Sequence, residues 1–228
     1  MVLRVGFFGG SFDPPHRGHV GVARAARAAL GLDRVLLAPV GTQPLKPEGA
    51  TATFEERVEM TRRAIAGEPG LEVSLADAPR PDRNYTVDTL ERLAAELGAE
   101  TRLYCLMGAD SFALLGKWWQ AAEILFRAEL VVASRPGEQL AIGPSLPVGV
   151  FWEPGREQTA MVGGVEICTL GLRRVTGERT WMHVLPGMEI DISATEVRRR
   201  IQADEHVAEL VVPSVLEYVR ERGLYAEP

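Results

Sequence analysis

The sequence predicts an α/β protein built on a doubly wound parallel sheet, and three observations lead to this prediction. Short apolar runs alternate with amphipathic helical patterns as far as about residue 134. Glycine- and proline-rich turns separate these segments, as expected for connections between strands and helices. The 228 residues, 46% hydrophobic and 25% charged, suit one well-buried domain better than two. We therefore treat residues 1–228 as a single domain.

The opening of the chain shows the alternation most clearly. Residues 3–8 form an apolar run, and a turn then leads into an alanine-rich helical pattern from Arg17 to Leu30. Gly31 is well placed to end that helix. A second apolar run at 34–38 completes a β-α-β unit. The same criteria predict strands at 71–75, 102–107 and 129–134, and helices at 54–66, 86–97 and within 110–126.

Residues 137–180 interrupt this pattern. They contain many glycine and proline residues and few periodic runs, with candidate strands only at 149–152 and 165–170. We interpret this segment as an insertion-like, β-rich excursion from the same domain and expect no separate domain there.

The last part of the chain returns to regular patterns. An apolar run at 182–185 is followed by helical patterns at 194–202 and 214–222. They predict a small helical subdomain over about 190–228. Because right-handed crossovers place the carboxyl ends of parallel strands along one edge, ligands are expected to bind at that edge.

Composition narrows the classes of function. Lys and Arg number 25 against 31 Asp and Glu, a net charge of -6, so no nucleic-acid partner is expected. The apolar stretch 2–8 contains Arg4 and is too short for a membrane span, so we expect a cytoplasmic protein with no membrane partner. Cys105 and Cys168 are too few and too far apart for a zinc site or a disulfide framework.

The strongest functional signal is the segment 9–19, GGSFDPPHRGH, between a strand and a helix. His16 and His19 lie three positions apart at a helix N-terminus and project to the same side. The free N–H groups and the helix dipole there favour anions. Gly9 and Gly10 allow a phosphate to approach the backbone closely. The sequence has neither a Walker A loop nor a Gly-x-Gly-x-x-Gly turn, so this segment is the candidate phosphate site.

A second signal, ISATEVRRR at 192–200, lies near the other end of the chain. Ser193 or Thr195 can cap a helix and leave its N–H groups facing a phosphate. Arg198, one turn into that helix, can fork onto phosphate oxygens. Alone, the pattern is more typical of a capped helix with a solvated basic face. Combined with the first motif in a parallel sheet, it indicates a second phosphate clamp.

The two motifs together resemble the HxGH nucleotidyltransferase superfamily and, within it, the bacterial nicotinate-nucleotide adenylyltransferases. The resemblance spans nearly the whole chain. The further blocks that carry it are the loop 39–46, YTVDTL at 85–90, GADS at 108–111 with Trp118, RPG at 135–137, and Val212-Pro213. The loop departs from the family pattern Pro-Pro-His-Lys, because Leu45 stands where the histidine is usual, although Lys46 is kept. Asn84 stands where Ser is common.

The resemblance implies transfer of an adenylyl group from ATP to nicotinate mononucleotide, giving deamido-NAD and pyrophosphate in NAD biosynthesis. The second pKa of a phosphate monoester is about 6, so the attacking phosphate needs no general base. His16 and His19 would donate hydrogen bonds to the α-phosphate, while Lys46 and Arg198 would hold the triphosphate; these four are the predicted catalytic residues. Mg²⁺ would accompany ATP, bound mostly by water and phosphate oxygens, with no metal site built from protein ligands.

The resemblance also assigns residues to the two substrates. The predicted ATP-binding residues are Gly9, Gly10, Ser11, Phe12, Gly108, Asp110, Ile192, Ser193, Thr195 and Arg198. The predicted acceptor-binding residues are Lys46, Thr86, Trp118 and Arg135. Trp118 would stack on the pyridine ring, and Thr86 would face its carboxylate at a helix start. From the residues alone, Phe12 and Trp118 suit core packing equally or better, Asp110 and Thr86 suit helix capping, and Arg135 suits a solvated surface.

Other functions remain open at this stage. The chain is compatible with another HxGH enzyme, such as a nicotinamide-nucleotide, phosphopantetheine or cytidyl transferase, or with a non-catalytic nucleotide-binding protein. The charging of tRNA is disfavoured by the acidic balance and by the lack of an anticodon-binding domain. A homo-oligomer and a monomer are both compatible with the sequence.

Overall fold

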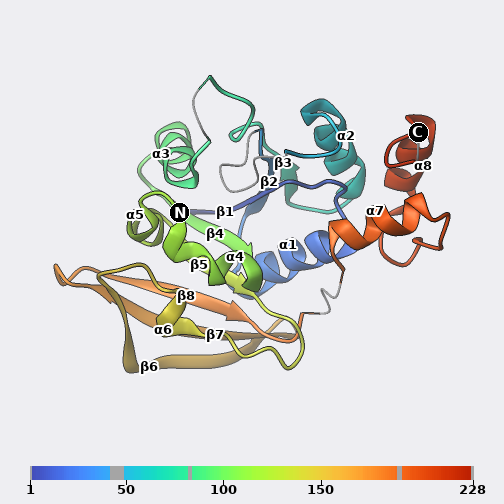
Figure 1. Ribbon diagram of the computed structural model, residues 1–228. Helices are drawn as coiled ribbons and strands as arrows, with labels where there is room; N and C mark the ends of the chain where they lie inside the picture. Colours follow the sequence, from blue (N-terminus) through green and yellow to red (C-terminus); the bar gives the residue numbers. More distant parts are fainter. Residues whose placement is uncertain (1, 42–48, 82–83, 189–191, 227–228) are drawn as a thin grey trace.

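The computed structural model describes residues 2–41, 49–81, 84–188 and 192–226. Its strands are β1 (Leu3–Gly10), β2 (Arg34–Pro39), β3 (Leu71–Val73), β4 (Thr101–Gly108), β5 (Glu129–Ala133), β6 (Val150–Val162), β7 (Val165–Arg174) and β8 (Arg179–Leu185). In the described part of the chain they form one eight-stranded sheet with the order β3-β2-β1-β4-β5-β8-β7-β6 (Figure 1). The predicted α/β class is confirmed.

The sheet is parallel over most of its width but not at one edge. Strands β3, β2, β1, β4, β5 and β8 pair in parallel, whereas β7 pairs antiparallel with β8 and with β6. The predicted parallel sheet accounts for six of these strands, and the hairpin β6–β7 adds an antiparallel edge to it. The excursion at 137–180 contributes this hairpin, which needs no helical crossover. Because β6 is exposed along most of its 13 residues, it lacks the apolar pattern that would have indicated so long a strand.

Helices cover both faces of the sheet (Figure 1). They are α1 (Arg17–Leu30), α2 (Phe54–Ala64), α3 (Thr86–Leu97), α4 (Ala109–Ala113), the 3₁₀ turn η1 (Leu115–Lys117), α5 (Ala121–Arg127), α6 (Ile142–Ser145), α7 (Ala194–Gln202) and α8 (Pro213–Glu221). The bounds of α1, α3 and α7 agree with the sequence prediction. Among the described residues, no helix is both long enough and apolar enough to cross a membrane.

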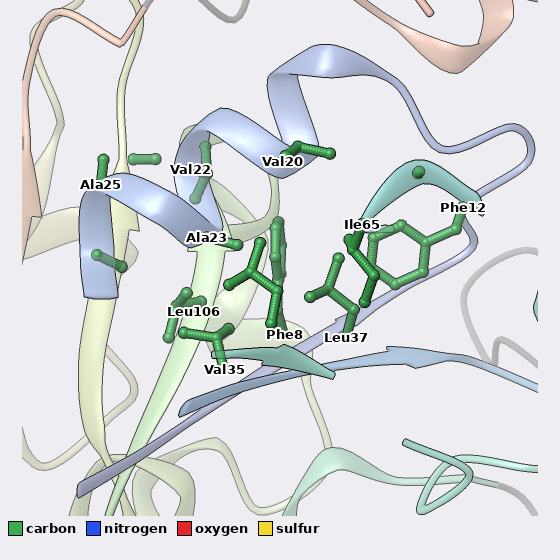
Figure 2. Close-up of a cluster of buried hydrophobic side chains, with 14 of the residues drawn as sticks. Phe8, Phe12, Val20, Val22, Ala23, Ala25, Val35, Leu37, Ile65 and Leu106 are labelled. Atoms are coloured by element: carbon green, nitrogen blue, oxygen red, sulfur yellow. The ribbon is translucent and has the colours of Figure 1, made fainter. Parts of the chain in front are cut away.

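Side chains of the central strands are buried on both faces of the sheet. In β1, Phe8 packs with α1, α2, α7 and α8 on one face, while Val5 and Phe7 pack with α3, α4 and α5 on the other. Figure 2 shows the first of these clusters, with Phe8 and Leu37 beneath α1. Burial on both faces explains why the strands read as continuous apolar runs without polar alternation.

Local sequence signals explain where several helices begin and end. At the start of α2, Thr53 Oγ1 accepts from the Glu56 N–H at 3.2 Å, and Glu56 Oε2 accepts from the Thr53 N–H at 2.9 Å. At the start of α7, Ser193 Oγ accepts from the Glu196 N–H at 3.1 Å. Gly31 ends α1 with φ +57°, a left-handed conformation that glycine adopts at little cost.

The strand order creates a crevice next to β1. The chain passes from β1 to β2 and β3 on one side, and later to β4 and β5 on the other. In doubly wound sheets ligands bind where this direction reverses, outside the carboxyl ends of the strands. The loop from β1 to α1 starts at this point, with His16 at its end and His19 in the first turn of α1, so the topology places the first motif beside the crevice.

Replacing Leu37 with Ala should destabilise the protein by about 2–5 kcal/mol, because its fully buried side chain would leave a cavity in the core. The matched control is Leu75→Ala, since Leu75 is 53% exposed and should change stability by less than about 0.5 kcal/mol. Urea unfolding measures both values. Equal losses for the two variants would contradict the position of the core.

Candidate active site

A cavity of about 1130 Å³ opens at the carboxyl ends of β1 and β4. Pockets for a single small ligand usually measure about 300–1,000 Å³, so this one lies just above that range. The predicted site residues that line it are Gly9, Gly10, Ser11, His16, His19, Thr86, Gly108, Asp110, Trp118, Arg135, Ile192, Ser193, Thr195 and Arg198. Residues from both ends of the sequence thus meet in one cavity.

Phe12 is the one predicted site residue within the described ranges that is not among those lining the cavity. Phe12 has no exposed surface, and its ring packs edge-on against Phe8 at 5.7 Å (Figure 2) and against His19 at 4.9 Å. The prediction that the Phe12 side chain lines the ATP pocket is therefore wrong, because burying an apolar ring between α1 and the sheet is more favourable. The Phe12 ring instead packs against the His19 ring and helps to hold it in place. Lys46 lies outside the described residues, so its role stays a prediction.

The two histidines form a stacked pair at the start of α1. Their ring centroids are 3.7 Å apart, with 26° between the ring planes. The backbone N–H of His16 donates to Nδ1 of His19 at 3.2 Å, so the neutral His19 ring carries its proton on Nε2. This hydrogen bond at the start of α1 therefore fixes the tautomer of His19 and leaves Nε2–H as the donor of the ring.

Burial keeps both imidazoles neutral. Desolvation lowers the pKa of His16 to about 4. The pKa of His19 is also lowered well below its usual value, first by desolvation and then by the neighbouring His16. At neutral pH each ring therefore offers one N–H donor and carries no net charge.

Arg198 of α7 reaches back to the first motif. Its Nη1 donates to the carbonyl oxygen of Asp13 at 2.6 Å and lies 3.7 Å from Asp13 Oδ2. Its Nη2 donates to Thr195 Oγ1 at 3.4 Å. Because a guanidinium has five N–H donors, the group keeps further donors for a bound anion. The predicted meeting of the histidine motif with Arg198 in one cavity agrees with these contacts.

The Asp13 carboxylate joins several segments around the cavity. Its Oδ2 accepts from the N–H of Thr51 at 2.7 Å, and its Oδ1 accepts from the N–H of Ala52 at 3.1 Å and from the hydroxyl of Tyr225 at 2.7 Å. Asp13 lies within the first motif, but the sequence pattern indicated no role for it. No local pattern could have indicated these partners, which lie between 38 and 212 positions away.

A second buried charge, Arg57, was also missed. Only 2% of it is exposed, and its guanidinium donates to the carbonyl oxygens of Ser11 at 2.8 Å and Ala52 at 3.3 Å. In the sequence it resembles any charged residue on an amphipathic helix. Its place beneath the β1–α1 loop shows that it fixes the path of that loop through two carbonyl groups.

Further aromatic and cationic residues, to which the sequence assigned no role, line the cavity beside the predicted acceptor residue Trp118. Tyr85, Lys117 and Trp119 line the cavity together with Trp118. The rings of Tyr85 and Trp119 are 5.7 Å apart and tilted by 34°. Trp118 also packs against the core formed with α3 and α5, so it belongs both to the cavity wall and to the core.

Buried polar groups lie deeper in the same cavity. Nδ2 of Asn84 donates to the carbonyl oxygens of Asp77 and Ala78, both at 2.9 Å. The Asp77 carboxylate accepts from the Thr89 hydroxyl, and desolvation raises its pKa. Burial raises the pKa of the Cys105 thiol to about 12, so Cys105 is a structural thiol with no nucleophilic role at neutral pH.

Asp110 and Arg135 lie at the rim. Arg135 Nη2 is 3.6 Å from Asp110 Oδ2, and both side chains are substantially exposed. Asp110 was predicted on the ATP side and Arg135 on the acceptor side. Their pairing places these two residues at the boundary between the predicted subsites.

Comparison with known proteins agrees with this geometry. The cytidylyltransferase-like family model matches residues 7–200. Proteins named as nicotinate-nucleotide adenylyltransferases from Pelobacter propionicus and Chromobacterium violaceum are 35% and 39% identical to this chain. Both matches cover 99% of this chain, with 99% and 100% of the relatives' own lengths. The chain belongs to the nicotinate-nucleotide adenylyltransferase family.

A solved structure supports the fold of this family member. The nicotinic acid mononucleotide adenylyltransferase of Plasmodium falciparum, complexed with NaAD, superimposes with a TM-score of 0.70 at 14% identity. The match covers 98% of this chain and 97% of that one. At this identity the likeness concerns the fold alone.

The depressed histidine pKa values predict a pH-dependent stability. Unfolding returns His16 to a pKa near 6.5, so the unfolded state binds more protons between pH 6.5 and about 4. The free energy of unfolding should therefore fall as the pH drops through this window and be fully present above it. Urea unfolding at pH 7 and pH 5 should show a smaller difference for His16→Gln than for the unmodified protein. An equal difference would contradict a neutral, buried His16.

Proposed function

We propose that this chain transfers the adenylyl group of ATP to nicotinate mononucleotide, releasing pyrophosphate and forming nicotinate adenine dinucleotide. The single observation that carries the proposal is the meeting of His16, His19 and Arg198 in one large cavity. The names of the full-length relatives support the same reaction.

The chemistry requires positioning more than proton transfer. A phosphate oxygen of the acceptor forms a bond to the α-phosphorus of ATP, and the bond from that phosphorus to the bridging oxygen of pyrophosphate breaks. Since the acceptor phosphate is ionised near neutral pH, no side chain has to remove a proton. Holding two reactants in line can supply roughly 7–11 kcal/mol of the barrier.

His16 and His19 act as hydrogen-bond donors to the α-phosphate. Their neutral rings are held in place by stacking and by the helix start, so little reorganisation is needed as charge develops. Arg198 binds the β- and γ-phosphates and stabilises the departing pyrophosphate. Lys46, predicted for the same role, would add a second cation.

Mg²⁺ enters as the counter-ion of the triphosphate. Within the described ranges, no cluster of three His, Cys, Asp or Glu side chains could hold a metal ion. The Asp13 carboxylate already accepts three hydrogen bonds. Phosphate oxygens and water are the ligands that Mg²⁺ ordinarily keeps in such sites, and the ion would neutralise part of the charge on the leaving group.

Nicotinate mononucleotide occupies the side of the cavity formed by Trp118 and the start of α3. The indole of Trp118 offers a stacking surface for the pyridine ring. Thr86 lies in the first turn of α3, where N–H groups and the helix dipole favour a carboxylate over an uncharged amide. This difference provides the basis for choosing nicotinate over nicotinamide.

The cytoplasm is the compartment we propose for this reaction. Both cysteines are free, and Cys105 is buried without a disulfide partner, as is usual where thiols are kept reduced. ATP and nicotinate mononucleotide are the proposed binding partners.

Replacing His19 with Ala should lower kcat at least about a hundredfold, because one preorganised donor to the α-phosphate is lost. Steady-state formation of the dinucleotide with ATP and Mg²⁺ measures the effect. The matched control is His206→Ala, since the His206 side chain is 80% exposed and is not among the lining residues of the cavity. Weaker binding of ATP with an unchanged kcat would contradict the catalytic role.

Replacing Trp118 with Ala should raise the KM for nicotinate mononucleotide several-fold, up to about tenfold, and leave the KM for ATP nearly unchanged. The same assay with nicotinamide mononucleotide tests the choice of acceptor. Equal or faster turnover with the amide would contradict the proposed carboxylate site at Thr86. An equal rise in both KM values would contradict the assignment of Trp118 to the acceptor side.

A further inference from the structure

Arg198 and Tyr225 approach the same aspartate from different parts of the C-terminal region. Tyr225 lies beyond α8 and donates its hydroxyl to Asp13 Oδ1 at 2.7 Å, across 212 positions of sequence. Arg198, in α7, donates to the backbone carbonyl of Asp13 at 2.6 Å but stays 3.7 Å from its carboxylate. The aspartate thus holds the tyrosine through its side chain and the arginine mainly through its backbone.

This arrangement is unusual for a buried aspartate beside an arginine. A carboxylate and a guanidinium ordinarily form two parallel hydrogen bonds, which would consume the donors of the arginine. Here three donors already occupy the Asp13 carboxylate, namely the N–H groups of Thr51 and Ala52 and the hydroxyl of Tyr225. Because these bonds spread the negative charge, the carboxylate attracts Arg198 less strongly.

We propose that Tyr225 is a positioning residue, whose hydroxyl occupies Asp13 and so keeps the Arg198 guanidinium available for the triphosphate of ATP. This inference rests on the proposed function only in assigning that triphosphate to Arg198. It gives the segment beyond α8 a role in nucleotide binding, although Tyr225 itself is not among the residues that line the cavity.

The surroundings of Tyr225 suit this role. Only 6% of the residue is exposed, and its hydroxyl lies 3.8 Å from the sulfur of Met60, which holds it only weakly. Burial and the adjacent carboxylate raise the pKa of Tyr225, so it stays a donor across the physiological range. Among the described residues, Arg57 is the other cation that interacts with Asp13, but its guanidinium already donates to two carbonyl groups. Arg198 is therefore the cation that a freed carboxylate would draw in.

The test is Tyr225→Phe, which removes the hydroxyl and keeps the ring. Titration calorimetry with Mg²⁺–ATP and no acceptor should show about three- to tenfold weaker binding, since the freed carboxylate would pair with Arg198. The matched control is Tyr218→Phe on α8, where Tyr218 packs its ring under the Arg63 guanidinium at 4.6 Å. That variant should bind ATP as the unmodified protein does.

A double-mutant cycle with Arg198→Ala separates positioning from a purely structural role. In the Arg198→Ala background, Tyr225→Phe should change ATP affinity by less than about twofold, because its effect acts through the guanidinium. Unfolding midpoints of all variants set a titration temperature at which each is folded. Unchanged affinity in the single variant, or an equal loss in both backgrounds, would overturn the proposal.

Different measurements test the role of Tyr225 and the proposed function, so that failure of one can be distinguished from failure of the other. The cycle measures ATP binding alone, whereas the acceptor panel measures turnover by the unmodified protein. Turnover with a different acceptor would overturn the acceptor assignment and leave the role of Tyr225 standing. If Arg198→Ala left ATP affinity unchanged, the link between Tyr225 and the triphosphate would be overturned even with nicotinate mononucleotide as the true acceptor.

Discussion

The buried carboxylate of Asp13 is the constraint on which the arrangement of the site depends. It lies in the loop after β1 and accepts hydrogen bonds from Thr51, Ala52 and Tyr225, while its backbone carbonyl accepts from Arg198. A buried carboxylate needs such donors, because an unpaired charge in the interior is very costly. The carboxylate and the backbone carbonyl of Asp13 together therefore join four separate segments around the crevice.

The strand order decides where this convergence occurs. The sheet presents the carboxyl ends of β1 and β4 side by side, and the cavity opens where the direction of the strand order reverses. The two layers of helices bury both faces of these strands, so the loops that follow them start from fixed points. A rigid base of this kind allows the site to be assembled from loops and helix starts.

The electrostatics of the site are local. A chain with a net charge of -6 has no general attraction for polyphosphates, and the cavity compensates with a few cations and helix starts. The histidines add polarity without charge, because burial holds their pKa values below the usual range. Neutral donors bind the α-phosphate of the ground state less tightly than charged donors would. Their hydrogen bonds can therefore strengthen more as negative charge develops in the transition state, and this strengthening is what accelerates the reaction.

Much of this was predictable from the sequence. The alternation of apolar runs and helical patterns determined the α/β class. The bounds of α1, α3 and α7 were predictable because helical periodicity and the residues that begin and end a helix are local features of the sequence. The spacing of His16 and His19 determined that both rings lie on one side of a helix start. Most of the site residues that the resemblance to a known family indicated line the cavity.

Only the tertiary structure decided the remainder. The antiparallel hairpin β6–β7 depends on the pairing of β7 with β6, a strand so exposed that it has no apolar periodicity in the sequence. The burial of Phe12 and Arg57 and the contact between Asp13 and Tyr225 depend on which distant segments the fold places next to them. Sequence patterns record short-range periodicity and capping, whereas these contacts join residues whose separation along the chain carries no local signal.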